Sequence, residues 1–146
     1  MRKPARNRQI DRILDANINR VKEGLRVSEE IARFILNSPV LTSQFKRLRH
    51  RVDIILEDVP RAREFIHKRC SNRDAGRNVE ESEFNRRDTE HVFRANMQRV
   101  KESLRVLEEF MKLESESAAR SFKKERYRMY EIEKSAARKI QALRHT

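Results

Sequence analysis

The sequence contains very few residues that turn a chain, with two glycines and three prolines among 146 residues. Tight turns between short strands depend on these two residue types, so their scarcity argues against a fold of many strands and favours long helices. The length is that of one ordinary domain. We therefore expect a single all-α domain that spans residues 1–146.

Cysteine and long apolar runs are equally scarce. The single cysteine, Cys70, excludes an internal disulfide framework and a multi-cysteine zinc site, and the four histidines show no metal-binding spacing. No apolar run approaches the roughly 20 residues of a membrane-spanning helix. The first residues, MRKPARNRQ, do not resemble a signal peptide. These features predict a cytoplasmic protein.

Positive charge is what the sequence has in excess. Lysine and arginine number 35 against 23 aspartate and glutamate residues, which gives a formal net charge of +12. Such a field attracts anions, whether nucleic acid, acidic membrane surfaces or phosphorylated small molecules. Aromatic residues make up 6% of the chain and include no tryptophan, and no P-loop or glycine-rich dinucleotide motif occurs.

A 15-residue motif occurs twice in the chain. ANINRVKEGLRVSEE at 16–30 returns as ANMQRVKESLRVLEE at 95–109, with 11 identical positions and an offset of 79. A second pair, FKRLRHRV at 45–52 and FKKERYRM at 122–129, has an offset of 77. This pattern predicts two homologous helical hairpins that form an antiparallel four-helix bundle.

Apolar residues at helical spacing set the expected elements. The first helix is expected to end at NSP, because a residue before proline avoids helical geometry, and Thr42 or Ser43 should begin the second. Asp58 is expected to cap a further short helix. The expected parts are a first repeat at about 10–58, the short helix and one long loop at 59–88, and a second repeat at 89–146, with caps at Asp88 or Thr89 and at Ser115 or Ser117.

The repeated asparagine and arginine lie at unusual places on the helix. On a helical wheel Asn17 and Gly24 fall at the edge of the core face, and Arg20 falls between apolar neighbours. A buried guanidinium requires a carboxylate, backbone carbonyls or an anionic ligand. Arg20 should therefore pair with acidic residues across the bundle or bind an anion, with Gly24 leaving room beside it. The second copy repeats this arrangement with Asn96, Arg99 and Ser103.

The other repeated charged residues fall mostly on the outward face, where ion pairs between neighbouring turns are common. Arg26 and its counterpart Arg105 belong to this set and are further candidates for phosphate binding. Identity between the copies at outward positions exceeds what packing requires. It indicates either a symmetric contact in a homo-oligomer or a ligand held between neighbouring helices.

Four segments together resemble a known family: RILDANINRVKEGLRVSEEIARF, RCSNRDAGRN, RANMQRVKESLRVLEEFMKL and FKKERYRMYEIEK. They are similar to the small hydroxymethylpyrimidine phosphate kinase of bacterial thiamine synthesis, a domain often fused N-terminal to thiamine-phosphate synthase. The resemblance implies phosphorylation of 4-amino-5-hydroxymethyl-2-methylpyrimidine phosphate to the diphosphate, with ATP and Mg²⁺. It also implies a functional association with thiamine-phosphate synthase.

The resemblance and the helical wheel together lead to a hypothesis for the site. Catalysis is assigned to Arg20, Arg99 and Asp74, binding of phosphates or the pyrimidine to Asn17, Asn96, Arg73, Arg77, Arg26 and Arg105, and magnesium to Asp74. Where the family is expected to continue with aspartate, valine, glycine and threonine, this chain has asparagine, valine and two glutamates at 78–81.

Two other functions stay open. The charge of +12 and the basic ends MRKPARNR and SAARKIQALRHT favour a nucleic-acid-binding helical bundle. A non-catalytic homologue would bind the pyrimidine phosphate without turnover. Substitution of Arg20 and Arg99 separates these readings, because a kinase should lose activity while staying folded and a scaffold should mainly lose stability.

Overall fold

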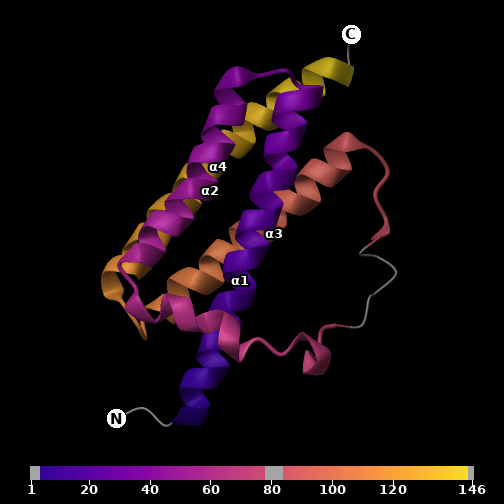
Figure 1. The fold of residues 1–146 in the computed structure, drawn as a ribbon. Helices are drawn as coiled ribbons and strands as arrows, with labels where there is room; N and C mark the ends of the chain where they lie inside the picture. Colours follow the sequence, from indigo (N-terminus) through magenta and orange to yellow (C-terminus); the bar gives the residue numbers. More distant parts are fainter. Residues whose placement is uncertain (1–3, 78–83, 145–146) are drawn as a thin grey trace.

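The computed structural model describes residues 4–77 and 84–144, and the regular elements in those ranges are all helical. Within them four long helices form the body, namely α1 (Pro4–Glu30), α2 (Pro39–Glu57), α3 (Thr89–Met111) and α4 (Glu116–Arg144). Helix α1 packs antiparallel to α2 and α3, and α4 packs antiparallel to the same two helices (Figure 1). The prediction of an all-α antiparallel four-helix bundle is confirmed.

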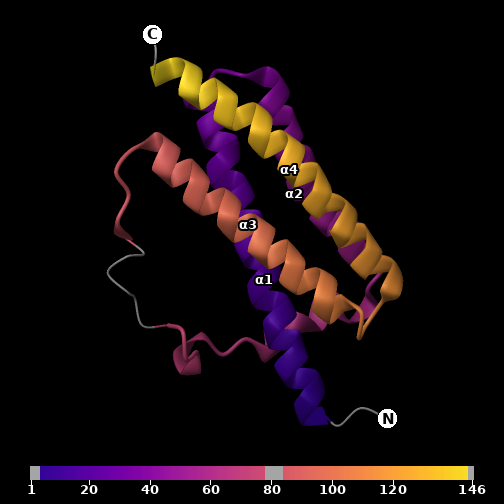
Figure 2. The same cartoon turned by 180° about the vertical axis from the view of Figure 1, so that it is seen from behind.

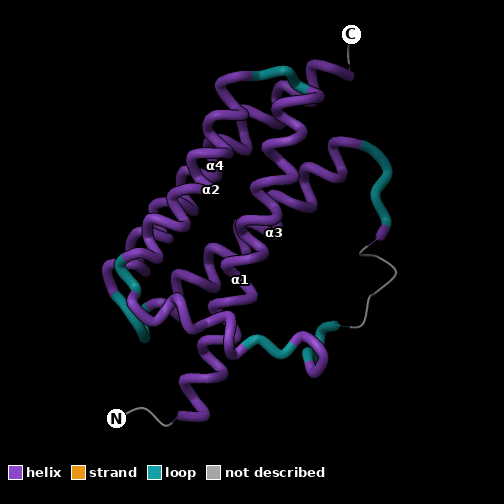
Figure 3. The backbone as a smooth tube through the Cα atoms, in the orientation of Figure 1, coloured by secondary structure: helices purple, strands orange, loops and turns teal. Residues whose placement is uncertain are grey.

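Shorter helical elements extend this body. The π-helix η1 (Ile31–Ile35) continues α1, and the 3₁₀ helices η2 (Pro60–Lys68) and η3 (Ser71–Arg73) follow α2 (Figure 3). Both cartoon views place η3 and the described parts of the following loop on the side of α1 and α3, away from α2 and α4 (Figures 1 and 2). None of the described helices is long and apolar enough to cross a membrane.

The start of α2 corrects a predicted boundary. The Oγ of Ser38 accepts the backbone N–H of Leu41 at 3.2 Å, and Pro39 occupies the first helical position, where its missing N–H leaves no bond unmade. The prediction that α2 begins at Thr42 or Ser43 is therefore wrong. Proline ends the preceding helix and also begins the next one.

The remaining caps agree with the sequence in the second hairpin and differ from it after α2. Asp88 caps α3 by accepting a backbone N–H at 2.8 Å, and Ser115 does the same for α4 at 3.1 Å. The cap expected at Asp58 is wrong, because Val59 precedes η2 and no side chain caps it. Pro60 in the first turn is as expected.

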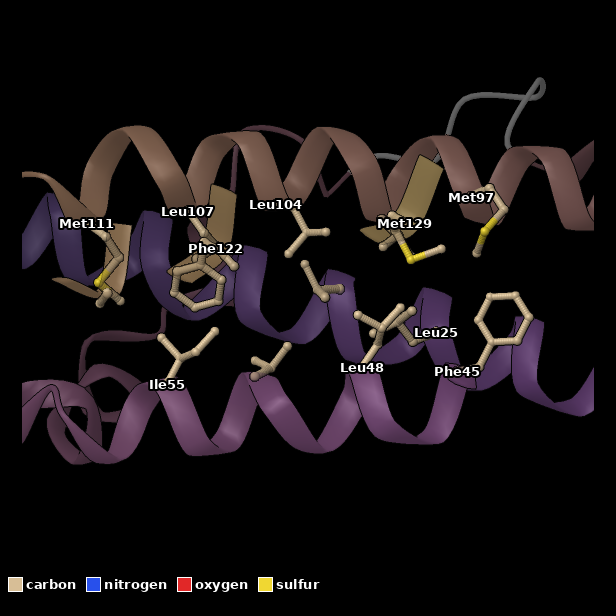
Figure 4. Packing of buried hydrophobic residues seen from close by; sticks show 14 of the residues in the cluster. Leu25, Phe45, Leu48, Ile55, Met97, Leu104, Leu107, Met111, Phe122 and Met129 are labelled. Atoms are coloured by element: carbon tan, nitrogen blue, oxygen red, sulfur yellow. The ribbon is translucent and has the colours of Figure 1, made fainter. Parts of the chain in front are cut away.

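The core lies between the hairpins and is formed by all four long helices, with further contributions from Ile31, Ala32, Val59 and Phe65. Leu14, Val21 and Leu25 are buried as their spacing predicts, whereas Ile35 is 48% exposed. Ile35 lies in η1, whose wider turn shifts the helical register and moves this residue off the core face. Figure 4 shows the packed side chains Leu25, Phe45, Leu48, Ile55, Met97, Leu104, Leu107, Met111, Phe122 and Met129.

Gly24 sets the distance between α1 and α3. A Cβ built on Gly24 would lie 2.5 Å from Cγ2 of Val100 and 3.1 Å from the backbone oxygen of Asn96. The room beside this glycine is therefore filled by the partner helix. The expectation that Gly24 leaves space for an arginine is wrong, because only a residue without a side chain permits this close crossing.

We expect Gly24→Ala to destabilise the protein by about 1 to 2 kcal/mol, because overpacking outweighs the better helix propensity of alanine. Urea denaturation measures the change. The matched control is Gly76→Ala, where the nearest atom to the new Cβ is 3.6 Å away, and it should have little effect. The cost should be smaller in a Val100→Ala background; an equal cost in both backgrounds would contradict the contact.

Glu125 on α4 is a buried charge between two arginines. Its carboxylate lies beside Arg128 on its own helix, at 2.5 Å, and beside Arg51 on α2, at 3.7 Å. Burial raises the pKa of Glu125, and the attraction of the two arginines only partly opposes this. The offset of 77 between FKRLRHRV and FKKERYRM makes Leu48 the counterpart of Glu125, and Leu48 is a buried apolar residue. The ionised carboxylate therefore costs stability at this position.

The stability of the protein should depend on the protonation of Glu125. Because burial raises the folded-state pKa of Glu125, the protonated side chain contributes stability that is fully present below the ordinary pKa of 4.5. This stability is lost as the pH rises through the folded-state pKa. Glu125→Gln removes this loss and should stabilise the protein by about 1 kcal/mol at pH 8. Melting temperatures between pH 5 and pH 8 test this: the gain should shrink towards low pH, and a gain independent of pH would contradict it.

An ion-pair cluster fastens η2 to the bundle. Nη2 of Arg61 donates to both carboxylate oxygens of Asp11 at 2.9 and 2.7 Å, and Nη1 donates to Glu114 at 2.6 Å. Asp11 is fully buried, and this burial raises its pKa although Arg61 acts in the opposite direction. Together with the buried ring of Phe65, the cluster fixes η2 against α1 and the turn between α3 and α4.

Candidate functional site

A cleft of about 440 Å³ lies between the first half of α1 and the segment that leaves η2. This volume suits a small organic ligand. Most of the lining side chains are polar, and they come from two stretches of sequence more than 40 residues apart. The lining residues are Gln9, Arg12, Ile13, Asp15, Ala16, Asn17, Asn19, Arg20, Arg69, Cys70, Ser71 and Asp74.

Three arginines give the cleft its charge. Arg69 donates from Nε and Nη2 to the two oxygens of Asp15, both at 2.8 Å. Arg12 donates from Nη2 to the backbone oxygen of Cys70 at 3.4 Å, and Arg20 donates from Nη1 to a neighbouring amide oxygen at 3.4 Å. The hydrogen bond from Arg69 to Asp15 raises the pKa of Arg69, so this guanidinium stays charged. The cleft is therefore suited to an anion.

The structure brings together three of the predicted site residues, Asn17, Arg20 and Asp74, in this cleft. The amide of Asn17 is fixed, because Nδ2 donates to the backbone oxygen of Ile13 at 2.8 Å and Oδ1 accepts from Arg20. The expected burial of Arg20 is wrong, since the residue is exposed. Its long side chain carries the guanidinium past the apolar residues that flank it on the wheel.

The second copy repeats part of this arrangement outside the cleft. Nδ2 of Asn96 donates to the backbone oxygen of Val92 at 2.8 Å, as Asn17 does one copy earlier. Arg99 is exposed, so its expected burial is also wrong, and neither Asn96 nor Arg99 lines the cleft. Ser103 is buried. Of the two repeated asparagine–arginine pairs, only the first contributes to this site.

Arg26 and Arg105 form ion pairs on the surface. Arg26 contacts Glu29 at 3.1 Å and Glu30 at 3.2 Å, and Arg105 contacts the equivalent glutamates at 3.8 and 3.3 Å. Neither arginine lines the cleft. These contacts agree with the outward face of ion pairs that the spacing also predicted.

The loop after η3 contributes a carboxylate to the cleft. Oδ1 of Asp74 accepts the backbone N–H of Gly76 at 2.9 Å, which holds the carboxylate in a tight turn. Arg73 and Arg77 flank it and are exposed, but they do not line the cleft. Positions 78–81, where the sequence departs from the expected pattern, lie outside the described residues.

Sequence reasoning missed Arg12, Asp15 and Arg69. One signal was present in the repeat. The offset of 79 makes Arg94 the counterpart of Asp15, so the charge is reversed directly before a motif that is otherwise similar in both copies. Such a break in the repeat marks a position where the two halves differ in role. The partner Arg69 had no local signal, since only the tertiary fold brings it to α1.

The comparison with protein families decides what kind of chain carries this cleft. The model of the ThiD2 family matches residues 12–135, most of the chain. The chain belongs to the ThiD2 family. The matched range contains both copies of the repeated motif of this ThiD2 member and all but one of the residues that line the cleft.

The relatives of this ThiD2 chain are longer proteins. It is 40% identical over 125 residues to a thiamine-phosphate synthase of Synechocystis sp., and 39% identical over 127 residues to one of Rhodopirellula baltica. These matches cover 85% and 86% of this chain but only 35% and 34% of the relatives. The chain therefore spans about a third of the length of the curated relatives it matches. No solved structure gives a significant match.

Proposed function

We propose that this ThiD2 chain phosphorylates 4-amino-5-hydroxymethyl-2-methylpyrimidine phosphate to the diphosphate in thiamine biosynthesis, with ATP as the phosphoryl donor. The names of its relatives support the pathway, and the sequence resemblance to the pyrimidine phosphate kinase supports the step. One structural observation carries the proposal. Three arginines and a loop carboxylate line one cleft of a size that suits a small phosphorylated molecule.

The charge of the cleft fits a reaction between anions. Arg12, Arg20 and Arg69 supply three positive charges, and Asp15 offsets one of them by direct pairing. The remaining cations would draw two phosphorylated reactants together and offset their mutual repulsion. Ile13 and Ala16 supply apolar surface in the same cleft, on which a pyrimidine ring can lie.

The proposed reaction requires little proton transfer. A phosphate oxygen of the substrate attacks the γ-phosphorus of ATP, and a new P–O bond forms. The bond from the γ-phosphorus to the β,γ-bridging oxygen breaks, and ADP leaves with the bonding electrons. Because the attacking oxygen is already ionised, positioned cations rather than a general base do most of the catalysis. Arg20 is exposed and lines the cleft, and it would contact the transferred phosphoryl group.

The residues of the cleft fit a magnesium ion bound mainly through substrate phosphates. Mg²⁺ in phosphoryl-transfer sites takes one or two protein carboxylates and fills its other positions with phosphate oxygens and water. In the part of the chain that the structure describes, no cluster of three or more metal-ligating side chains occurs. Asp74 lines the cleft and would hold the ion, which would neutralise charge on the phosphates of ATP.

The synthase step fits the chain less well. The relatives named thiamine-phosphate synthase contain about two thirds of their length beyond the matched region. The described residues form helices only, and they correspond to about a third of those relatives. We therefore assign the kinase step to this chain and the synthase step to a separate domain or protein.

A coupled assay of ADP release tests the proposal. The pure protein is incubated with Mg²⁺-ATP and the pyrimidine phosphate, and the free pyrimidine alcohol serves as the control substrate. We expect turnover with the monophosphate only, since the alcohol leaves the arginines without an anion. No turnover with either compound would overturn the kinase assignment.

A further inference from the structure

One arginine of the cleft is held differently from the others. Arg69 donates one edge of its guanidinium fork, Nε and Nη2, to the two oxygens of Asp15, each at 2.8 Å. Within the described part of the chain no hydrogen bond or ion pair engages its Nη1. The side chain of Asp15 is 12% exposed and that of Arg69 is 44% exposed. A largely buried carboxylate thus fixes one edge of the guanidinium of Arg69, a residue that lines the cleft.

The pair is not needed to attach η2 to the bundle. Arg61, near the start of η2, already bonds to the buried Asp11 and to Glu114, and Phe65 is buried in the core. An ion pair with a partner as exposed as Arg69 adds little to stability. The geometry of the pair instead fixes the direction of the guanidinium, because a fork bound along one edge cannot rotate.

A second guanidinium stands beside the first. Nη2 of Arg12 lies 3.4 Å from the backbone oxygen of Cys70, the residue that follows Arg69. Ser71 supplies a hydroxyl to the same part of the cleft. Arg12 and Arg69 with Asp15 leave one net positive charge, Arg20 adds a second, and the carboxylate of Asp74 on the same cleft offsets one. The remaining positive charge favours an anionic ligand such as a phosphate.

We propose that Arg69, oriented by Asp15 and assisted by Arg12, binds the phosphate monoester of the substrate. Asp15 is then a positioning residue, which acts on the ligand only through Arg69. The identity of the ester rests on the proposed function, whereas the ligand class follows from the cations and their geometry. Binding through the open edge of Arg69 selects phosphorylated pyrimidine over the free alcohol.

The second repeat does not carry this arrangement. The offset of 79 places Arg94 at the position of Asp15, and Arg94 pairs with Glu90 on its own helix at 3.8 Å. An arginine there cannot orient another arginine. In the described part of the chain, this arrangement of Asp15 and Arg69, which we call the clamp, therefore occurs once. We expect one phosphate monoester to bind through it per chain.

Isothermal titration without ATP tests the clamp independently of turnover. The probes are the pyrimidine phosphate, inorganic phosphate and the free pyrimidine alcohol, and the proteins are the full chain with Arg69→Ala, Asp15→Asn and the double substitution. Arg63→Ala is the matched control, because Arg63 is exposed on η2 and does not line the cleft. Melting temperatures show that each variant is folded.

We expect Arg69→Ala to weaken binding of the pyrimidine phosphate by about 30-fold or more and Asp15→Asn by about tenfold, from the loss of charge-assisted hydrogen bonds and of orientation. Arg63→Ala should bind as the unmodified protein does. In the Arg69→Ala background, Asp15→Asn should cost nothing further. Additive losses would overturn the positioning role of Asp15, since they would show that it acts without Arg69.

The outcomes separate the clamp from the kinase. Phosphate binding that depends on Arg69 in a protein without turnover supports the clamp and rejects the kinase. Turnover with an unchanged KM in Arg69→Ala supports the kinase and overturns the clamp. A protein that binds neither the pyrimidine phosphate nor inorganic phosphate overturns the clamp.

Discussion

Arg20→Ala is expected to lower kcat/KM for the pyrimidine phosphate about 100-fold while the melting temperature stays unchanged. Arg20 is exposed and lines the cleft, and within the described residues its one hydrogen bond is a long one of 3.4 Å to Asn17. Removing it therefore costs the fold little. Removing a cation that stabilises charge on the transferred phosphoryl group costs about 10²-fold to 10³-fold in rate. Steady-state kinetics with the ADP-release assay and a thermal melt measure both effects.

Arg99→Ala is the matched control, because Arg99 occupies the same position in the second copy of the motif. It is also exposed but lies outside the cleft. Its loss should change kcat/KM by less than about threefold. Equal losses for Arg20 and Arg99 would contradict the one-sided site and favour a site that uses both halves. A loss of stability in Arg20→Ala would favour a structural role for the arginine.

The helices were predictable because their signals are local. The period of apolar residues from Ile10 onward and the caps at Asp88 and Ser115 depend on neighbours within a few positions. Where two local rules competed, the prediction failed, as at Pro39, which both ends one helix and begins another. The register shift at η1 moved Ile35 out of the core, and no residue pattern announced that π-helix.

The site was less predictable because its geometry is tertiary. A helical wheel correctly placed Asn17 at the edge of the core face, where it is buried. It could not show how far the side chain of Arg20 reaches, and that residue is exposed. It also treated Gly24 as empty space, whereas α3 fills that space. Arg69 joins Asp15 across 54 positions of sequence, and only packing of η2 on α1 creates that pair.

Two of the repeated charged residues expected on the outward face, Glu29 and Glu108, are buried instead. Arg49 of α2 contacts Glu29 of α1 at 3.3 Å, and Arg126 of α4 contacts Glu108 of α3 at 2.9 Å. The two offsets of the repeat relate these pairs to each other. Because each glutamate is buried and links the two helices of its hairpin, identity at these positions follows from the same packing in both halves. Sequence identity there is thus no argument for a ligand.

Arg61→Ala is expected to destabilise the protein by about 3 kcal/mol, the largest stability effect of any single change considered. Asp11 is fully buried, and Arg61 is the cation that holds both of its oxygens. Breaking a buried ion pair from one side leaves an uncompensated charge and costs about 3 to 5 kcal/mol. The lower end applies because the side chain of Arg61 is 34% exposed. Urea denaturation at pH 8 measures the loss.

The pH dependence identifies the cause of this destabilisation. Burial raises the pKa of Asp11, and the charge of Arg61 partly opposes this increase. Removal of Arg61 should therefore raise the folded-state pKa of Asp11 further. Stability lost at high pH should therefore return as the pH falls and Asp11 becomes protonated.

Two further variants serve as controls. Arg63→Ala, two positions along η2 on the exposed side, should change stability by less than about 0.5 kcal/mol. Adding Asp11→Asn to Arg61→Ala should recover much of the loss, because the amide needs no cation. An equal loss at pH 5 and pH 8 would contradict the charge of Asp11 as the cause of the destabilisation.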